Sequence, residues 1–245
     1  MRFVLPVKIA LAAIACLLVG AGAEFGARPV DALTCERIQE RRDILSLSES
    51  ERTAFFKALR TFQSESRPFT YDTLAKIHDD YNAEVHGTAR FLVWHRVFTR
   101  VLEYELQRID PSVTIPYWDW SINSQAPHEH PIFSSTWAGG NGRPEDGCVV
   151  DGWFADWRPA YPSPGCLMRK FRGAPGLNPF YPPEVLRYIS DESKTYAAFN
   201  ELLELSPHNV IHYTIGGHMG MSFSPSDPLF FLHHSFVDLL WAQWQ

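Results

Sequence analysis

The chain has 245 residues, of which 45% are hydrophobic and 20% charged, so it is long enough for one sizeable core and has a globular composition. A net charge of −6 and the lack of any block of basic residues argue against nucleic acid or an anionic membrane as a partner. Aromatic residues make up 14% of the chain, which favours a rigidly packed core.

The N-terminus is typical of a secretory signal peptide. Arg2 and Lys8 precede an uncharged run over 9–23 that ends in small residues, and such a run is shorter than the roughly 20 residues of a membrane-spanning helix. We expect residues 1–23 to be cleaved and 24–245 to form one secreted domain with no membrane attachment. The chain stops inside a helical pattern, so we expect this domain to be incomplete at its C-terminus.

Three helices are predicted in the first half of the chain. The first begins at Ser48, which with Glu51 fits a capping box. The second covers 71–86 and frays near Asn82, and the third covers 87–109, where apolar residues wrap a broad face.

The middle of the chain, residues 121–193, has a different composition. It holds many glycines and ten of the 18 prolines, which predicts a long irregular excursion over a helical core. In an oxidising compartment Cys148 and Cys166 could staple this excursion, which leaves Cys35 without a partner in 24–245.

Helical patterns return after the excursion. One helix is predicted over 192–205, and Pro207 then allows a fresh start for two turns over 208–215. A last helix is predicted to start at Asp227 and Pro228, an N-cap residue followed by a proline at the first helical position.

The histidines are the candidate metal-binding residues of the chain. His208 and His212 are spaced i, i+4 and leave one helix face about one turn apart, which is a chelating geometry. His234 follows in the last helix, next to His233. The first half of the chain adds three more histidines among apolar helix positions, at 78, 86 and 95.

Two sets of three histidines without cysteine or carboxylate favour copper over calcium or magnesium, which prefer oxygen ligands. One three-histidine set could equally hold zinc. Two sets brought together indicate a binuclear site that handles oxygen.

These motifs resemble those of the tyrosinase family, the paired copper proteins that include catechol oxidases and molluscan haemocyanins. The stretches that carry the resemblance are HGTARFLVWHR with PYWDWS behind it, PHNVIHYTIGGHMG, and SDPLFFLHHSFVD. The resemblance implies a mainly α fold, with a four-helix-bundle core that holds a binuclear copper site and with long irregular loops. Residues 24–245 would then be a tyrosinase copper-binding domain.

The resemblance also implies which residues bind metal. The first copper would be bound by His78, His86 and His95, and the second by His208, His212 and His234. His234 is preferred to His233 because the family's ligand stands four residues after the phenylalanine of the DPxF motif, here Phe230. His233 would then support the site without binding copper.

Two further residues bear on catalysis. The resemblance implies that Glu204 holds a water and that Asn209 orients it, so that together they deprotonate an incoming phenol. The sequence departs from the family at Glu84, where many members have a cysteine that forms a thioether to the second histidine. His218, Met219 and Met221 are candidates for the pocket mouth.

The function implied is oxidation of phenols by O2 with two copper ions, with O2 as co-substrate. Monophenols would be hydroxylated at the ortho position, and o-diphenols would be oxidised to o-quinones. The alternatives are a catechol oxidase without the hydroxylation step, a haemocyanin-like O2 carrier, and a non-catalytic or zinc protein that keeps the fold. The expected partners are small phenols and catechols, and the sequence does not determine the oligomeric state.

Overall fold

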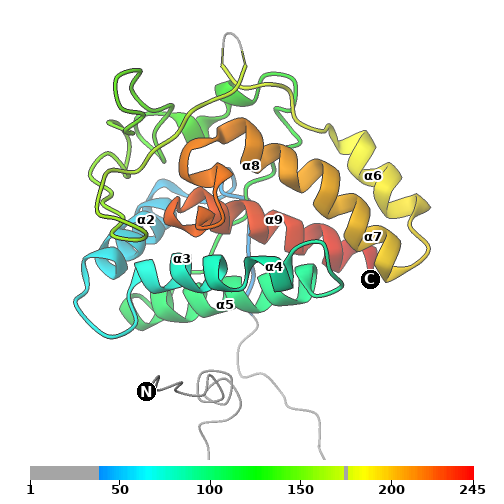
Figure 1. Ribbon diagram of the computed structural model, residues 1–245, viewed down its shortest axis with the longest axis horizontal. Coiled ribbons are helices and arrows are strands. Elements are labelled where there is room, and N and C mark those ends of the chain that lie inside the picture. Colours follow the sequence, from blue (N-terminus) through cyan, green and yellow to red (C-terminus); the bar gives the residue numbers. More distant parts are fainter. Residues whose placement is uncertain (1–38, 174–175) are drawn as a thin grey trace, which may run out of the picture. The chain divides into compact units, whose positions relative to one another are not determined.

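The computed structural model describes residues 39–173 and 176–245, and these are built almost wholly of helices and loops (Figure 1). The expected signal peptide and Cys35 lie outside the described residues. The helices are α2 (Glu49–Ser64), α3 (Tyr71–Asp80), α4 (Asn82–Val85), α5 (Phe91–Ile109), α6 (Pro183–Glu192), α7 (Tyr196–Leu203), α8 (Asn209–Ile215) and α9 (Leu229–Trp244). Pairing of extended backbone in this part of the chain is limited to two isolated bridges. The mainly α prediction is confirmed.

Helix α2 begins where the capping box predicts. The Glu51 backbone N–H donates to the Ser48 hydroxyl at 3.3 Å, and the Ser48 N–H donates to the Glu51 carboxylate at 2.8 Å. The apolar stripe of α2 is buried and includes Phe55, Phe56 and Phe62. Helix α2 packs on α5, and α5 packs in turn on α9, so α5 lies at the centre of the helical core.

Helix α9 is buried over most of its length, because every residue from Leu229 to Val237 is inaccessible to solvent or nearly so. A helix that is apolar on all sides belongs to a core rather than to a surface. Asp227 caps it as predicted: its carboxylate accepts from the Leu229 N–H at 3.0 Å. The helix itself begins at Leu229, two residues after the cap.

Two predictions about prolines were wrong. The excursion over 121–193 contains helix α6, which starts at Pro183; a proline suits the first turn of a helix because that turn needs no internal N–H donor. Pro207 does not start a separate helix. It lies in a π-helical turn, Glu204–His208, that joins α7 to α8 without a break.

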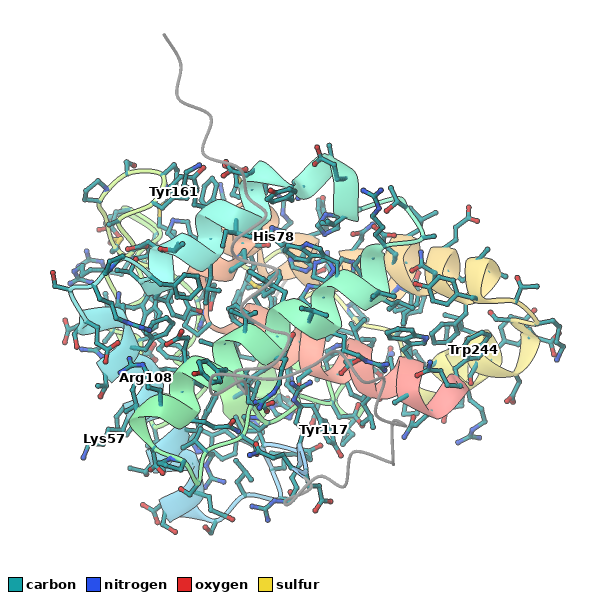
Figure 2. The ribbon with its side chains drawn as sticks, turned by 90° about the horizontal axis from the view of Figure 1, so that it is seen from below. Lys57, His78, Arg108, Tyr117, Tyr161 and Trp244 are labelled. Atoms are coloured by element: carbon teal, nitrogen blue, oxygen red, sulfur yellow. A yellow bond between two sulfur atoms is a disulfide. The ribbon has the colours of Figure 1, made fainter. Side chains whose placement is uncertain are left out.

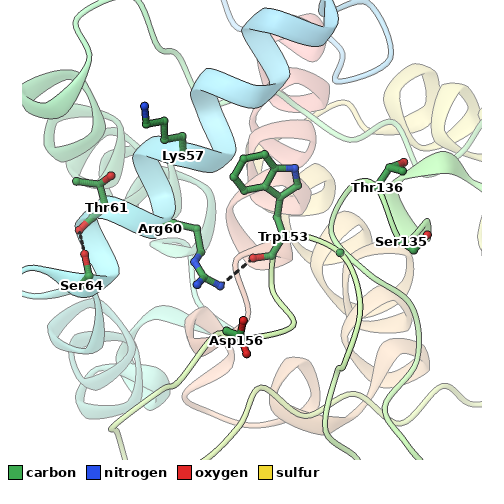
Figure 3. Close-up of a pocket in the computed structure, with 9 residues that line it drawn as sticks. Lys57, Arg60, Thr61, Ser64, Ser135, Thr136, Trp153 and Asp156 are labelled. Atoms are coloured by element: carbon green, nitrogen blue, oxygen red, sulfur yellow. Dashed lines mark hydrogen bonds between the residues drawn. The ribbon is translucent and has the colours of Figure 1, made fainter.

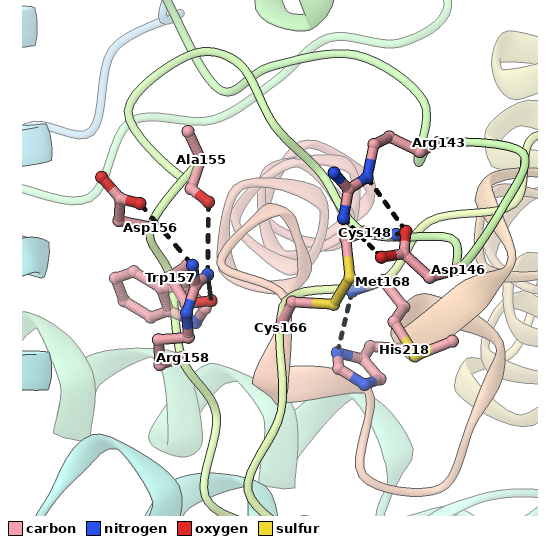
Figure 4. The surroundings of a disulfide bond; sticks show 10 residues. All are labelled: Arg143, Asp146, Cys148, Ala155, Asp156, Trp157, Arg158, Cys166, Met168 and His218. Atoms are coloured by element: carbon pink, nitrogen blue, oxygen red, sulfur yellow. Dashed lines mark hydrogen bonds and ion pairs between the residues drawn. A yellow bond between two sulfur atoms is a disulfide. The ribbon is translucent and has the colours of Figure 1, made fainter.

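The rest of the excursion is irregular and stapled, as predicted. Cys148 and Cys166 form a disulfide whose Cα atoms are 5.6 Å apart (Figure 4). The excursion also inserts Arg169 into the core, where its guanidinium forms an ion pair with Asp227 and both side chains are 0% exposed.

No helix within 39–173 or 176–245 has the length and apolar character needed to cross a bilayer.

Candidate metal centre

The predicted histidines come together in two clusters inside the helical core. The first consists of His78 from α3, His86 after α4, and His95 from α5. The second consists of His208, His212, His233 and His234 from the α7–α8 run and α9. Within each cluster the ring nitrogens that face one another lie within 4.8 Å. Figure 2 shows His78 on α3 beside α5.

Backbone carbonyls fix the tautomers of the first cluster. The Nδ1–H groups of His78, His86 and His95 donate to the carbonyls of Ser222 at 2.5 Å, Asn82 at 3.0 Å and Phe91 at 2.8 Å. A carbonyl only accepts, so Nδ1 of each neutral ring carries the proton and Nε2 carries a free lone pair. The His78 and His95 Nε2 atoms are 3.4 Å apart. Two lone pairs at that separation repel, and a cation between them satisfies both.

In the second cluster two rings are held in the same way, whereas His234 Nδ1 has no hydrogen-bond partner among the described residues. His212 Nδ1–H donates to the Met219 carbonyl at 2.8 Å, and His208 Nδ1–H is shared between the Asn209 side-chain oxygen at 3.1 Å and the Glu204 carbonyl at 3.3 Å. The Nε2 atoms of His208 and His234 are 3.4 Å apart. Such partners at the far nitrogen are what orients metal-binding imidazoles in proteins.

His233 differs from its neighbours because its far nitrogen is an acceptor. The Trp120 indole N–H donates to His233 Nδ1 at 3.1 Å. An indole N–H is only a donor, so the His233 proton is on Nε2, which then has no lone pair for a metal. This favours His234 over His233 as the metal-binding residue, although both rings lie in the cluster.

Burial keeps the clustered histidines neutral. It lowers the pKa of His78 to about 3 and that of His212 to about 4. The pKa values of His95, His208 and His234 are lowered well below the usual value, first by burial and then by the neighbouring rings. Neutral imidazole is the form that binds transition metals.

The two clusters are adjacent. The His95 and His234 rings, one from each cluster, stack with their centroids 4.2 Å apart and 8° between their planes. Phe230 packs against a histidine of each cluster: the centroid of its ring is 4.1 Å from that of His234 and 4.9 Å from that of His78. Phe230 therefore packs on imidazoles of both clusters, and it keeps the space behind them apolar.

A hollow of about 540 Å³ leads from the surface to both clusters. Four of the histidines line it, together with Glu204, Asn209, Met219 and Met221. Its mouth carries the exposed apolar side chains of Leu205 and Met221. His218 is not among its lining residues, because its ring faces the Met168 backbone N–H instead, with 3.4 Å between Nδ1 and that nitrogen.

Glu204 is 3% exposed, and burial raises the pKa of its carboxyl. One of its oxygens accepts from the Gly87 N–H at 2.6 Å. Sequence reasoning did not find this bond or the backbone carbonyls that hold the histidines. Trp120 could have been found, because it belongs to the PYWDWS motif.

A second hollow, of about 640 Å³, lies between α2 and the excursion (Figure 3). Its lining residues include Lys57, Arg60, Trp153 and Asp156 and no histidine, and the Arg60 guanidinium donates to the Trp153 carbonyl at 3.0 Å. The hollow therefore takes no part in the histidine site.

Comparison with known proteins agrees with this geometry. A family model described as the common central domain of tyrosinase matches residues 68–245. The chain is 33% identical over 233 residues to a tyrosinase of Streptomyces lincolnensis, covering 84% of this chain and 82% of that one. It is 30% identical to grixazone synthase of Streptomyces griseus, covering 85% and 84%.

Solved structures are similar as well. A polyphenol oxidase from Thermothelomyces thermophila superposes with a TM-score of 0.67 at 28% identity, covering 83% of this chain and 69% of that one. A functional unit of octopus haemocyanin superposes with a TM-score of 0.58 at 24% identity, covering 83% and 52%; at that identity the likeness concerns the fold.

Proposed function

The chain belongs to the tyrosinase family of binuclear copper oxidases, and from this premise we propose that it hydroxylates monophenols at the ortho position and oxidises o-diphenols to o-quinones. The observation that carries the proposal is the hollow of about 540 Å³ that opens both histidine clusters to the surface. A haemocyanin-like O2 carrier does not need such access, so the hollow favours an enzyme.

We assign the first copper to His78, His86 and His95, and the second to His208, His212 and His234. The facing lone pairs of His78 and His95 support the first set. The distance of 3.4 Å between His208 Nε2 and His234 Nε2 supports the second. Bound copper supplies the activation of O2 and the exchange of electrons with the phenol. The protein fixes the six imidazoles, keeps them neutral and holds an apolar wall behind them.

The hollow suits a phenol ring. Leu205 and Met221 offer apolar contact at the mouth, and the described lining residues include neither lysine nor arginine. A substrate carboxylate would therefore lack a cationic partner there. The class of substrate that fits is a small phenol or catechol whose substituent is uncharged or cationic.

Glu204 is proposed as the acceptor of the phenol proton. Its raised pKa brings the carboxylate closer to the working pH, which improves a general base. Asn209 holds His208 through its side-chain oxygen and lines the hollow. Its proposed role is to orient a water beside Glu204.

One observation favours a catechol oxidase as the second candidate. Glu204 already accepts a short hydrogen bond from Gly87, and this stabilises the carboxylate and weakens it as a base. A catechol oxidase has no hydroxylation step and does not need this base. The basicity of Glu204 therefore distinguishes the two candidate activities.

The test compares the copper-loaded protein with Glu204→Gln, which keeps the shape of the side chain. Hydroxylation of a monophenol such as tyramine should fall by about 10²–10⁴-fold, while oxidation of 4-methylcatechol is retained. Glu201→Gln, an exposed glutamate one turn earlier on α7, is the matched control. Wild-type protein with two coppers that oxidises neither substrate would refute the enzyme proposal, and catechol turnover alone would establish the second candidate.

Cleavage after residue 23, secretion, and a copper domain over 24–245 remain part of the proposal. The disulfide between Cys148 and Cys166 supports an oxidising compartment. N-terminal sequencing of the protein exported by its host tests the cleavage position.

A further inference from the structure

One face of α7 and its π-turn extension holds the loop that follows His86. The loop has no regular structure between α4 and α5. Three side chains spaced four residues apart bond to three consecutive residues of it. Tyr196 Oη donates to the Ala89 carbonyl at 2.8 Å, Asn200 Nδ2 donates to the Thr88 carbonyl at 3.1 Å, and the Gly87 N–H donates to Glu204 at 2.6 Å. We name Tyr196, Asn200 and Glu204 the α7 clamp.

His86 lies between a very short helix and an irregular loop, so its position depends on where that loop is anchored. Helix α4 before it has only four residues, and the Gly87 after it has a φ of +64°, so neither neighbour continues a helix through His86. Within the described residues no covalent tether reaches it: Glu84 is an exposed carboxylate, and Cys148 and Cys166 are bonded to each other.

The clamp contains a buried amide that packing alone does not explain. Asn200 is 5% exposed and lies between Phe199 and Leu203, which are each 1% exposed. A buried amide without hydrogen bonds costs about 1–3 kcal/mol. An apolar residue would suit this face of α7 better unless the bond to Thr88 has a use.

The clamp links the two histidine clusters directly. The helical run that carries it continues through the π-turn into His208. Glu204 is bonded next to a histidine of each cluster. Its carboxylate accepts from the N–H of Gly87, the residue after His86, and its backbone carbonyl accepts from His208 Nδ1–H at 3.3 Å. The rings of His86 and His208 are 6.2 Å apart.

We propose that Tyr196 and Asn200 are positioning residues that set the spacing of the two metal centres by fixing His86 against His208. This inference rests on the proposed ligand assignment. It concerns two residues that touch neither the hollow nor the histidines, so their effect on the metals has to pass through the loop 87–89.

The experiment uses Tyr196→Phe, which removes one hydroxyl, and Asn200→Ala. Tyr188→Phe, on an exposed tyrosine of α6, is the matched control. The first readout is amide hydrogen exchange over 86–90 in copper-free protein. We expect exchange roughly fivefold faster in each clamp variant and unchanged in the control.

The second readout is the electron paramagnetic resonance signal of the oxidised protein with two Cu²⁺ bound. Two closely bridged Cu²⁺ ions couple and give no signal, so a change in their spacing appears as detectable copper. We expect a signal in the clamp variants at unchanged copper content, with kcat lowered more than KM. Faster exchange with copper that stays silent would overturn the proposal. Uncoupled copper in the wild type would instead refute the binuclear assignment, and unchanged exchange would separately refute the clamp.

Discussion

Replacing Asp227 with asparagine tests how the excursion is tied to the helix that carries His234. Arg169 Nε and Nη2 donate to the two Asp227 oxygens at 2.7 and 3.0 Å, and both side chains are 0% exposed. Asparagine keeps one oxygen as an acceptor for the Leu229 N–H, so the cap of α9 is preserved. The charge is lost, and so is the second oxygen, which accepts from Arg169 Nε. Removing one member of a buried ion pair costs about 3–5 kcal/mol, because the other charge stays buried.

The assay is urea unfolding of copper-free protein at constant pH, followed by tryptophan fluorescence. We expect Asp227→Asn to lower the free energy of unfolding by about 3–5 kcal/mol. Asp146→Asn is the control, because Asp146 pairs with Arg143 on the same excursion but in solvent, and it should change little. Equal effects would refute the reasoning. They would mean that the three backbone carbonyls around Arg169 Nη1 replace the lost carboxylate.

Three further predictions concern metal content, acid stability and the disulfide. After copper loading and dialysis, metal analysis should find one copper in His234→Ala and two in His233→Ala; the reverse result would exchange their roles. His130 is a buried histidine of the excursion, and burial lowers its pKa to about 4. Its unfolded pKa is about 6.5, so below that pH the unfolded state binds more protons than the folded state. Stability is therefore lost as pH falls from about 6.5 towards 4, by about 2 kcal/mol at pH 5, and urea midpoints of His130→Gln should lack this part of the fall between pH 7 and pH 5. Replacing both Cys148 and Cys166 with serine should cost about 3 kcal/mol in urea unfolding, given the 18-residue separation, and an unchanged midpoint would show that Arg169 and its partners hold the excursion alone.

The histidine clusters could be predicted because metal binding demands particular side chains. Few residues provide a neutral nitrogen ligand, so the positions of the histidines along the chain carry most of the information. The helices that bring them together were predictable for a related reason. Helix α2 has both a capping box and a regular apolar stripe, and α9 begins at a clear N-cap residue, Asp227.

The partners of the histidines could not be predicted, since most of them are backbone groups. Every residue has a carbonyl, so the sequence does not indicate that Ser222 accepts from His78 or that Met219 accepts from His212. The pairing of Arg169 with Asp227 joins residues 58 apart through an irregular segment, and no periodic pattern reports it. Helix α6 was missed because two adjacent prolines, at 182 and 183, outweighed the helical residues that follow.

The π-turn at Pro207 accounts for how one helical run serves two tasks. Tyr196, Asn200, Glu204, His208 and His212 follow one another at intervals of four residues. In an α-helix each such step overshoots a full turn by about 40°, so four steps would rotate His212 by about 160° away from Tyr196. A π-turn, with its i→i+5 bonds, contains more residues per turn, and four residues within it rotate by less than a full turn. The turn at Glu204–His208 therefore reverses part of the drift. It lets residues that hold the loop after His86 share a side of the run with residues that face the metal site. The proline that looked like a helix break is part of the turn that makes this possible.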